Sequence, residues 1–256
     1  GTFHALCYRL LRTEVGRSLG LAEVKLVGDA DRFRIIRDVM DPSLEAEDVR
    51  DAIDRYKDRL VSPAAAWEEL KGLGAGRADD AEKYVRAYEG YQRRLQTRGL
   101  HDYGDLLMRV VHALARDPEL RGALSSRYRF LMVDEFQDVN PAQHELIQLL
   151  LDRHDNVWAV GDDDQAIYGW RGSDVHYILG FREDFPNASI YKLAENYRSQ
   201  PVVVERATQL VGHNRARFAK PLRAVASPSA RRAVTVCMAT AEGSEARWIA
   251  RSMQTL

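Results

Sequence analysis

The sequence predicts an α/β fold in which a parallel sheet is combined with a largely helical region. After about residue 100, apolar runs typical of strands alternate with amphipathic helical patterns. This alternation is typical of a parallel sheet that is covered by helices on both faces. Between about residues 25 and 100, one helical pattern follows another. The length of 256 residues is compatible with one large domain or two smaller ones.

Composition narrows the class of protein. With 45% hydrophobic and 29% charged residues, the chain has the balance of an ordinary globular protein. The net charge of −1 gives no overall basic field, so a site for a polyanion has to be a local patch. The two cysteines, Cys7 and Cys237, make no disulfide framework and favour a reducing cytosol. No apolar run approaches the ~20 residues of a membrane span, so we expect no membrane partner.

The first hundred residues predict helices and one short extended segment. Helical spacing of apolar residues begins at Phe3, with Thr2 as the N-cap. Residues 24–27 fit either a short strand or an extended link. Ser62 and Pro63 start a later helix in the favoured order of cap and proline. Nothing in this arginine- and tyrosine-rich region resembles catalytic chemistry.

Strands and helices are expected in alternation after residue 100. The segment 218–232 contains prolines, serines and arginines, and it fits a solvated loop or a charged, polyanion-facing connection. The expected strands are 129–135, 156–162, 188–193 and 233–239, and the expected helices are 102–114, 141–153, 199–213 and 244–256.

Acidic residues crowd the end of the predicted strand 129–135. Asp134 and Glu135 end this strand, and Asp138 follows. Ligands of open parallel sheets bind at the carboxyl ends of strands, and a cation there relieves the repulsion between like charges. Mg²⁺ usually takes one or two carboxylates, and Glu135 could then deprotonate a water that attacks a phosphate. The alternative is a helix N-terminus capped by Asp138 or Asn140. We expect capping by Asp138 and a metal site at Asp134 and Glu135.

A second strand end repeats the acidic pattern and leads into aromatic residues. Three aspartates end the predicted strand 156–162 and its turn, and Gln165, Tyr168, Trp170 and Arg171 follow. Aromatic side chains next to a cation can stack unpaired bases at roughly 1–3 kcal/mol each, while the arginine holds phosphate. Alternatively, the two aromatic residues belong to a core between domains.

Arg198 precedes the predicted helix 199–213. Cations are unfavourable at a helix N-terminus. The position therefore suggests an anionic ligand such as a phosphate, although pairing with Glu195 is an alternative.

Three long motifs resemble a known protein family. The segments VDEFQD (133–138), VGDDDQAIYGWRG (160–172) and LAENYRS (193–199) are similar, in this order and spacing, to the UvrD/PcrA/Rep family of superfamily 1 DNA helicases. The opening GTFHALCYRLL and the segment HDYGDLL (101–107) resemble two further segments of these motors. The resemblance extends from residue 1 to about residue 200.

This resemblance implies a role for each candidate residue. Asp134 would bind the Mg²⁺ of MgATP, and Glu135 would be the catalytic base. Gln165 would sense the γ-phosphate and couple it to DNA, and Arg198 would reach the same phosphate. The residues implied to contact single-stranded DNA are Thr2, Phe3, His4, Tyr168, Trp170 and Arg171.

The resemblance also implies a domain organisation. We expect an incomplete RecA-like parallel sheet of the P-loop NTPase type, with residues 1–24 and 101–188 in the first RecA-like domain. Residues 25–100 would form an inserted all-helical subdomain, whose arginines either contact DNA or are solvated. Residues 189–256 would start a second RecA-like domain.

One motif of the family is absent. The phosphate-binding loop G-x-x-x-x-G-K-[ST] does not occur in the 256 residues, and the chain begins at Gly1 without a methionine. Both observations suggest a piece of a longer protein. Without the amide groups and lysine of that loop, we expect the isolated chain to be nearly inactive as an ATPase.

We therefore expect part of an ATP-dependent 3′–5′ DNA helicase or translocase of DNA repair or replication. Its partners would be ATP, single-stranded DNA and junctions of single- and double-stranded DNA, in the bacterial cytosol at the nucleoid. The alternatives are a shortened, non-enzymatic DNA-binding or regulatory module, and a helicase–nuclease fusion.

Overall fold

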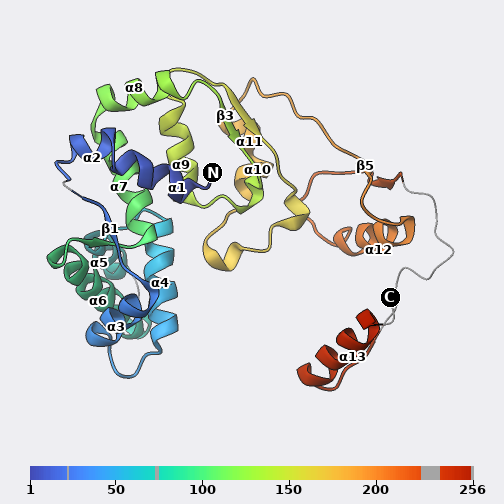
Figure 1. Cartoon of the computed structure of the whole chain (residues 1–256), viewed down its shortest axis with the longest axis horizontal. Coiled ribbons are helices and arrows are strands. Elements are labelled where there is room, and N and C mark those ends of the chain that lie inside the picture. Colours follow the sequence, from blue (N-terminus) through green and yellow to red (C-terminus); the bar gives the residue numbers. More distant parts are fainter. Residues whose placement is uncertain (22, 73–74, 226–236, 255–256) are drawn as a thin grey trace. The chain divides into compact units, whose positions relative to one another are not determined.

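The computed structural model describes residues 1–21, 23–72, 75–225 and 237–254, without the side chains of residues 75–78 and 171. Figure 1 shows the chain coloured along its sequence. It divides into two compact units, Gly1–Ala188 and Ser189–Leu256. Within the described ranges, no helix combines the length and the apolar character that crossing a membrane would require.

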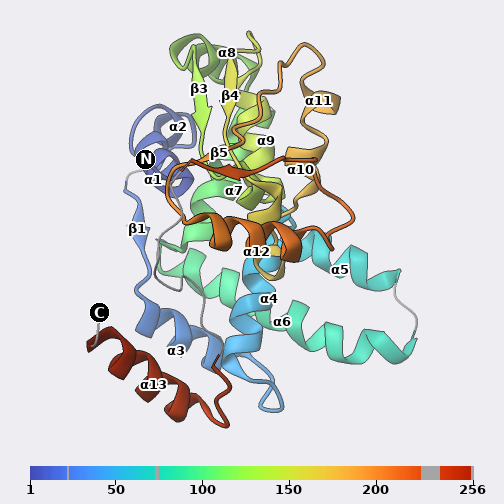
Figure 2. The same cartoon turned by 90° about the vertical axis from the view of Figure 1, so that its right-hand side faces the viewer.

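A strand–helix–strand unit lies at the centre of the first compact unit. Strands β3 (Leu131–Val133) and β4 (Val157–Ala159) pair in parallel, as Figure 2 shows. Helix α9 (Pro141–Leu150) connects them. Because the strands are parallel, their carboxyl ends lie at the same edge. The predicted order of strand, helix and parallel strand is confirmed, although both strands are shorter than expected.

Only one face of the β3–β4 pair is covered. Leu131 and Val133 pack with Phe136 in an apolar cluster on one side. On the other side, Met132 and Trp158 lie opposite each other and are 82% and 61% exposed. The expectation of helices on both faces is therefore wrong for this pair. The strands in the described part of the chain form three separate two-stranded sheets rather than one wider sheet.

A second small parallel sheet joins the two ends of the helical region. Strand β1 (Lys25–Leu26) pairs with β2 (Leu100–His101), so residues 24–27 contain a strand rather than only a link. Ser62 Oγ accepts a hydrogen bond from the Ala65 amide, which confirms the predicted cap. The helices between these strands share an apolar core of their own. They are α3 (Asp29–Val39), α4 (Ala46–Asp58), α5 (Pro63–Lys71) and α6 (Ala75–Thr97).

A further apolar core forms around helices of the first unit that lie outside this region. Thr2 Oγ1 accepts a hydrogen bond from the Ala5 amide, so the predicted N-cap is confirmed. Cys7 is fully buried in this core. Besides α9, the helices of the first unit outside the helical region are α1 (Phe3–Leu11), α2 (Glu14–Ser18), α7 (Tyr103–Arg116), α8 (Pro118–Arg127), α10 (His176–Leu179) and α11 (Phe181–Asp184).

A buried ion cluster joins α4 to α7. Lys57 Nζ donates to both carboxylate oxygens of Asp102 and to Asp105 Oδ1, each at 2.8 Å. The Tyr91 hydroxyl donates to Asp102 Oδ2 at 2.9 Å. Burial raises the pKa of Asp102, but the charges of Lys57 and Arg32 outweigh it and hold this pKa below its usual value. The cluster is satisfied by charge pairing and hydrogen bonds, which buried charges require.

In the part of the second unit that the structure describes, there are one small sheet and two helices. Strands β5 (Glu195–Asn196) and β6 (Arg223–Ala224) pair in parallel. The expected helices are confirmed as α12 (Pro201–Val211) and α13 (Glu242–Gln254). Strand β6 lies within the connection predicted at 218–232. The proline- and arginine-rich composition of that segment did not indicate a strand.

The other two strands expected here are not observed. Residues 188–193 form no strand, so that prediction is wrong. Tyr191 and Leu193 are 76% and 84% exposed, and this apolar run has no paired strand in the described residues. Of the strand expected at 233–239, the first four residues lie outside the described part, and the last three form no strand.

Candidate functional site

Asp134 and Glu135 lie immediately after β3, at the carboxyl end of the strand, and both are exposed. Glu135 has left-handed backbone angles (φ 52°, ψ 45°). Residues other than glycine rarely adopt this conformation, and it is costly unless the surroundings hold it. Asp134 Oδ1 accepts a hydrogen bond from the Glu135 amide at 3.0 Å. The two carboxylates are therefore held by the sharp turn that follows the strand.

Gln137 links this turn to the end of β4. Its side chain is only 2% exposed. Gln137 Nε2 donates to Glu135 Oε2 at 2.8 Å, and its Oε1 accepts from the Asp162 amide at 3.0 Å. Glu135 Oε1 has no hydrogen-bond partner in the part of the chain that the structure describes. The amide of Gln137 thus orients one oxygen of the Glu135 carboxylate.

The link continues into the loop after β4. Asp162 Oδ2 accepts from Gln165 Nε2 at 2.7 Å, and Asp162 Oδ1 accepts from the Asp164 amide at 3.1 Å. These bonds stabilise the short 3₁₀ turn η2 (Asp163–Gln165). A continuous hydrogen-bonded path therefore runs from Glu135 through Gln137 and Asp162 to Gln165. The structure brings these predicted site residues together.

Gly161 allows this close approach. A Cβ atom at position 161 would lie 2.6 Å from Gln137 Oε1 and 3.0 Å from the Phe136 amide nitrogen. Both distances are shorter than normal contacts, so a side chain here would displace Gln137 or the backbone. The absence of a side chain at Gly161 therefore allows the ends of β3 and β4 to pack closely.

Asp138 does not cap α9, contrary to the expectation from the sequence. Asn140 is the N-cap, and it forms a reciprocal capping box with Gln143. Asp138 instead ends the 3₁₀ turn η1 (Phe136–Asp138), two residues too early to reach the free amides of the helix. Its buried Oδ1 has no hydrogen-bond partner in the described residues. Burial, assisted by the charge of Glu135, raises the pKa of Asp138.

The aromatic loop, residues 166–174 with Tyr168 and Trp170, is attached to the turn η1. Ser173 Oγ donates to the Asp138 carbonyl at 3.0 Å, and the Asp174 amide donates to the Val139 carbonyl at 3.1 Å. Between them and Gln165, Tyr168 and Trp170 are 38% and 62% exposed, so neither is buried in the core of the first unit. Trp170 lies in the 3₁₀ turn η3 (Gly169–Arg171). Arg171 is in this turn as well, although its side chain lies outside the described part.

Helix α4 contacts this loop through its last residue. Asp58 Oδ1 accepts a hydrogen bond from Asn140 Nδ2 at 2.7 Å. A Cβ atom at Gly172, which has a positive φ of 88°, would lie 3.5 Å from Asp58. Burial raises the pKa of Asp58 to about 7, with further contributions from Asp54 and Asp102. The sequence contained no signal for this contact, because it joins residues 82 positions apart.

Thr2, Phe3 and His4 have structural contacts of their own. Thr2 caps α1, and Phe3 packs partly against two apolar cores. His4 meets the ring of Tyr103 edge-on, with the ring centroids 5.7 Å apart. Burial lowers the pKa of His4, although the charges of Asp102 and Asp54 oppose the shift. The role of these residues in DNA binding stays a prediction.

Arg198 lies in the second unit, in the turn before α12. Asn196 Oδ1 accepts hydrogen bonds from the amides of Arg198 and Ser199, at 3.1 and 2.8 Å. Glu195 pairs with Arg223 at 2.7 Å, so the alternative pairing of Arg198 with Glu195 is not observed. Among the described residues, no hydrogen-bond or ion-pair partner is found for the exposed Arg198 side chain.

The residues at the end of β3 fit a hydrated magnesium ion. The described residues hold no group of three or more metal-binding side chains. Mg²⁺, however, usually takes one or two carboxylates and keeps waters and substrate phosphates as its other ligands. The exposed Asp134 carboxylate fits that requirement, because its Oδ2 has no partner in the described part of the chain.

Comparisons with known proteins agree with the motifs. The profile of the UvrD/REP helicase N-terminal domain matches residues 1–186. Two curated relatives are named ATP-dependent DNA helicase PcrA, one from Staphylococcus epidermidis (strain ATCC 35984) and one from Staphylococcus aureus (strain Mu50). Each is 33% identical to the chain over 227 residues, which cover 86% of the chain and 30% of the relative. The match covers most of the chain, and the chain belongs to the UvrD/REP helicase family.

Proposed function

We propose that the chain is part of an ATP-dependent DNA helicase or translocase that moves 3′ to 5′ on single-stranded DNA. The curated relatives carry the name ATP-dependent DNA helicase, and the chain spans about 30% of their length. The observation that carries the proposal is the hydrogen-bonded path from Glu135 to Gln165. That path enters the loop on which Tyr168 and Trp170 are exposed, so one loop serves both the nucleotide and the DNA.

In this proposal, the residues after β3 perform the chemistry. Asp134 would hold Mg²⁺, which neutralises phosphate charge when it is bound. Glu135 Oε1 accepts a proton from the attacking water, while Gln137 holds the other oxygen and so orients the carboxylate. Gln165 contacts the γ-phosphate, and its bond to Asp162 ties that contact to the loop. Arg198 would neutralise charge on the same phosphate.

The DNA surface would consist of the aromatic loop and the start of α1. Exposed Tyr168 and Trp170 offer faces on which unpaired bases stack, and Arg171 would bind phosphate. Thr2, Phe3 and His4 would extend this track. The net charge of −1 favours such a local surface over a general basic field.

We further propose the domain organisation that the motifs imply. Residues 1–24 and 101–188 would form part of a RecA-like domain, with residues 25–100 inserted and residues 189–256 starting a second such domain. The parallel pairing of β1 with β2 supports the insertion, because it brings both ends of the helical region together. The separate apolar core of that region supports it as well.

ATP hydrolysis tests the enzymatic proposal in the protein that carries this chain. We expect single-stranded DNA to stimulate turnover, and Glu135→Gln to lower kcat about 100- to 10,000-fold while DNA binding is retained. Hydrolysis that survives Glu135→Gln would contradict the assignment of the base. The 256-residue chain itself, which lacks a phosphate-binding loop, should hydrolyse ATP at background rate. If the full protein binds DNA without hydrolysis, the DNA-binding module is the correct alternative.

A further inference from the structure

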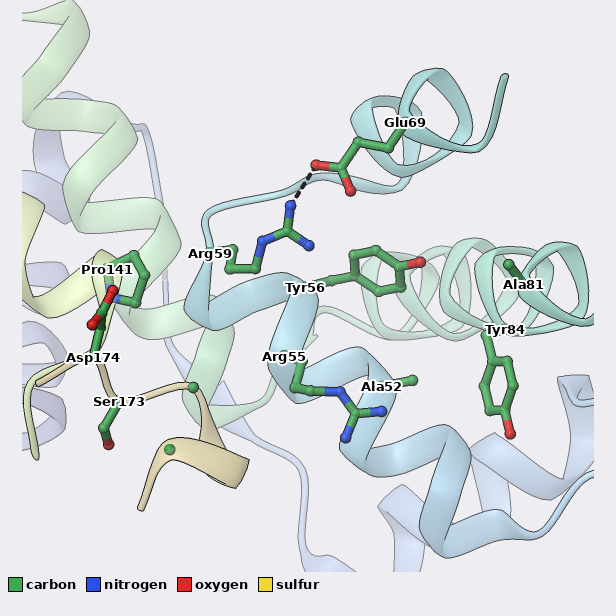
Figure 3. Close-up of a pocket in the computed structure, with 12 residues that line it drawn as sticks. Ala52, Arg55, Tyr56, Arg59, Glu69, Ala81, Tyr84, Pro141, Ser173 and Asp174 are labelled. Carbon is green, nitrogen blue, oxygen red and sulfur yellow. Dashed lines mark hydrogen bonds and ion pairs between the residues drawn. The ribbon is translucent and has the colours of Figure 1, made fainter. Parts of the chain in front are cut away.

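A pocket of about 590 Å³ lies between the helical region and the aromatic loop. Figure 3 shows its lining side chains. One wall is formed by α4, with Arg55, Tyr56 and Arg59, and another by Tyr84 of α6. The loop that contains Gly169 and Gly172 closes the opposite side. Trp170 lies between these two glycines in η3, so the pocket adjoins the proposed base-stacking residue.

Arg55 gives the pocket a cation that is free to bind an anion. Its side chain is exposed, and no ion-pair or hydrogen-bond partner is found for it among the described residues. Arg59, by contrast, pairs with Glu69 at 2.7 Å, as the dashed line in Figure 3 marks. The lining carboxylate of Asp174 is engaged by the amide and ring of His176. Arg55 is therefore the lining cation that is not already paired with a carboxylate in the described residues.

Two tyrosines give the same pocket aromatic surface. Tyr56 stacks on Tyr88 with the ring centroids 5.5 Å apart and the planes within 3°, so one of its faces is covered. Tyr84, from the neighbouring helix, is half-buried and borders the pocket. An aromatic face and a free guanidinium in one pocket match the base and the phosphate of an unpaired nucleotide. A duplex would offer no free base face to these rings.

We propose that this pocket is a second subsite for single-stranded DNA, which receives the strand next to the base at Trp170. Arg55 binds a phosphate of this segment, and the Tyr84 ring stacks on a base. The inference rests on the proposed function and extends it, since it places helices α4 and α6 on the path of the strand. The helical region then holds DNA directly, beyond supporting the loop.

Oligonucleotide binding by the full 256-residue chain tests this inference. Fluorescence anisotropy would compare oligothymidylates of about 4 and about 12 nucleotides, lengths that span small and extended sites. Arg55→Ala should weaken only the longer ligand and should lower the slope of log K against log salt by about 0.7, the value for one phosphate on a single strand. Tyr84→Ala should weaken the longer ligand at least about fivefold, and Tyr84→Phe should restore it.

Matched variants distinguish failure of the second subsite from failure of the proposed function. Arg34→Ala removes an exposed α3 arginine outside the pocket and should leave the salt slope unchanged. Trp170→Ala should weaken both ligands. If Trp170→Ala and Arg55→Ala have no effect, or no oligonucleotide binds, the proposed function and the second subsite both fail. If Trp170→Ala weakens binding but Arg55→Ala behaves like Arg34→Ala, only the second subsite fails. If Tyr84→Ala unfolds the chain, the salt slope measured for Arg55→Ala alone tests the second subsite.

Discussion

At the scale of single residues, the central feature is an amide side chain between two strand ends. Gln137 donates to Glu135 and accepts from the amide of Asp162. A glutamine can do both at once, whereas an ionised glutamate could only accept. This explains why a buried amide, and not a third carboxylate, lies two residues after Glu135.

Replacing Gln137 should slow hydrolysis without removing substrate binding. In the protein that carries the chain, Gln137→Ala leaves Glu135 free to rotate, and misplacement of a catalytic group by about 1 Å can cost about 100-fold in rate. We expect kcat to fall by that order, with KM for ATP little changed. Gln148→Ala, on α9, is the matched control and should retain activity. A rise in KM alone would show that Gln137 serves binding instead.

Asp58 should make stability depend on pH near neutrality. Its pKa rises from 3.8 to about 7 on folding, so the unfolded state loses this proton first. The contribution of Asp58 to stability therefore falls as the pH increases from about 4 to about 7. It does not change further at higher pH. Asp58→Asn should stabilise the chain by about 1–3 kcal/mol at pH 8 and have little effect at pH 4. Thermal unfolding at both pH values checks this, with exposed Asp155→Asn as control. Equal effects at both pH values would contradict the shifted pKa.

The sequence predicted part of the site at this scale. Asp134 and Glu135 follow β3 directly, and Gln165 lies in the loop after β4, so their common edge could be inferred from parallel topology. Gln137 and Asp58 could not be inferred in this way. Gln137 acts through a 3₁₀ turn that has no apolar periodicity, and Asp58 meets Asn140 only after the chain has folded.

At the scale of elements, the ion cluster of Lys57, Asp102 and Asp105 fixes one helix against another. It joins α4, which borders the proposed DNA pocket, to the first turn of α7. Removing one member of a buried cluster leaves an uncompensated charge, which costs more than the cluster contributes.

Lys57→Met should therefore destabilise the chain by about 3–5 kcal/mol. Denaturant unfolding measures the change, and exposed Lys71→Met, which breaks only a surface pair with Glu68, should cost under about 1 kcal/mol. Because folding lowers the pKa of Asp102, the stabilisation exists above its unfolded pKa and is lost as the pH falls below about 3.9. A Lys57→Met effect that persists unchanged at lower pH would contradict this origin.

Helices were predicted more successfully than strands. Periodic apolar residues and local caps, such as Thr2 and Ser62, determine where helices form, and both caps are observed. Strands depend on a partner elsewhere in the chain. The apolar run at 188–193 forms no strand, whereas Arg223 and Ala224, in a proline- and arginine-rich segment, pair with β5. Whether each segment forms a strand depends on a pairing partner elsewhere in the fold, and local sequence patterns do not reveal that partner.

At the scale of the whole molecule, the uncovered face of the β3–β4 pair should promote association. Met132 and Trp158 lie side by side there, and Phe130 is 71% exposed nearby in the sequence. Contiguous apolar surface and unpaired strand edges of this kind favour contacts between copies.

We expect the 256-residue chain to self-associate at micromolar to millimolar concentration. Met132→Lys combined with Trp158→Lys should shift it toward the monomer in light-scattering chromatography. Met238→Lys makes the same change at a methionine that is 96% exposed in the second unit and should have little effect. A wild-type chain that stays monomeric at the highest concentration would contradict the prediction.

The most direct test of the account is a double-mutant cycle between Gln137 and Gln165 in the protein that carries the chain. The measured quantity is the stimulation of ATP turnover by single-stranded DNA. If the two side chains belong to one hydrogen-bonded path, the double variant should lose little more stimulation than either single variant, because each change already breaks the path. Losses that add independently would show that the path from Glu135 to the DNA loop transmits nothing.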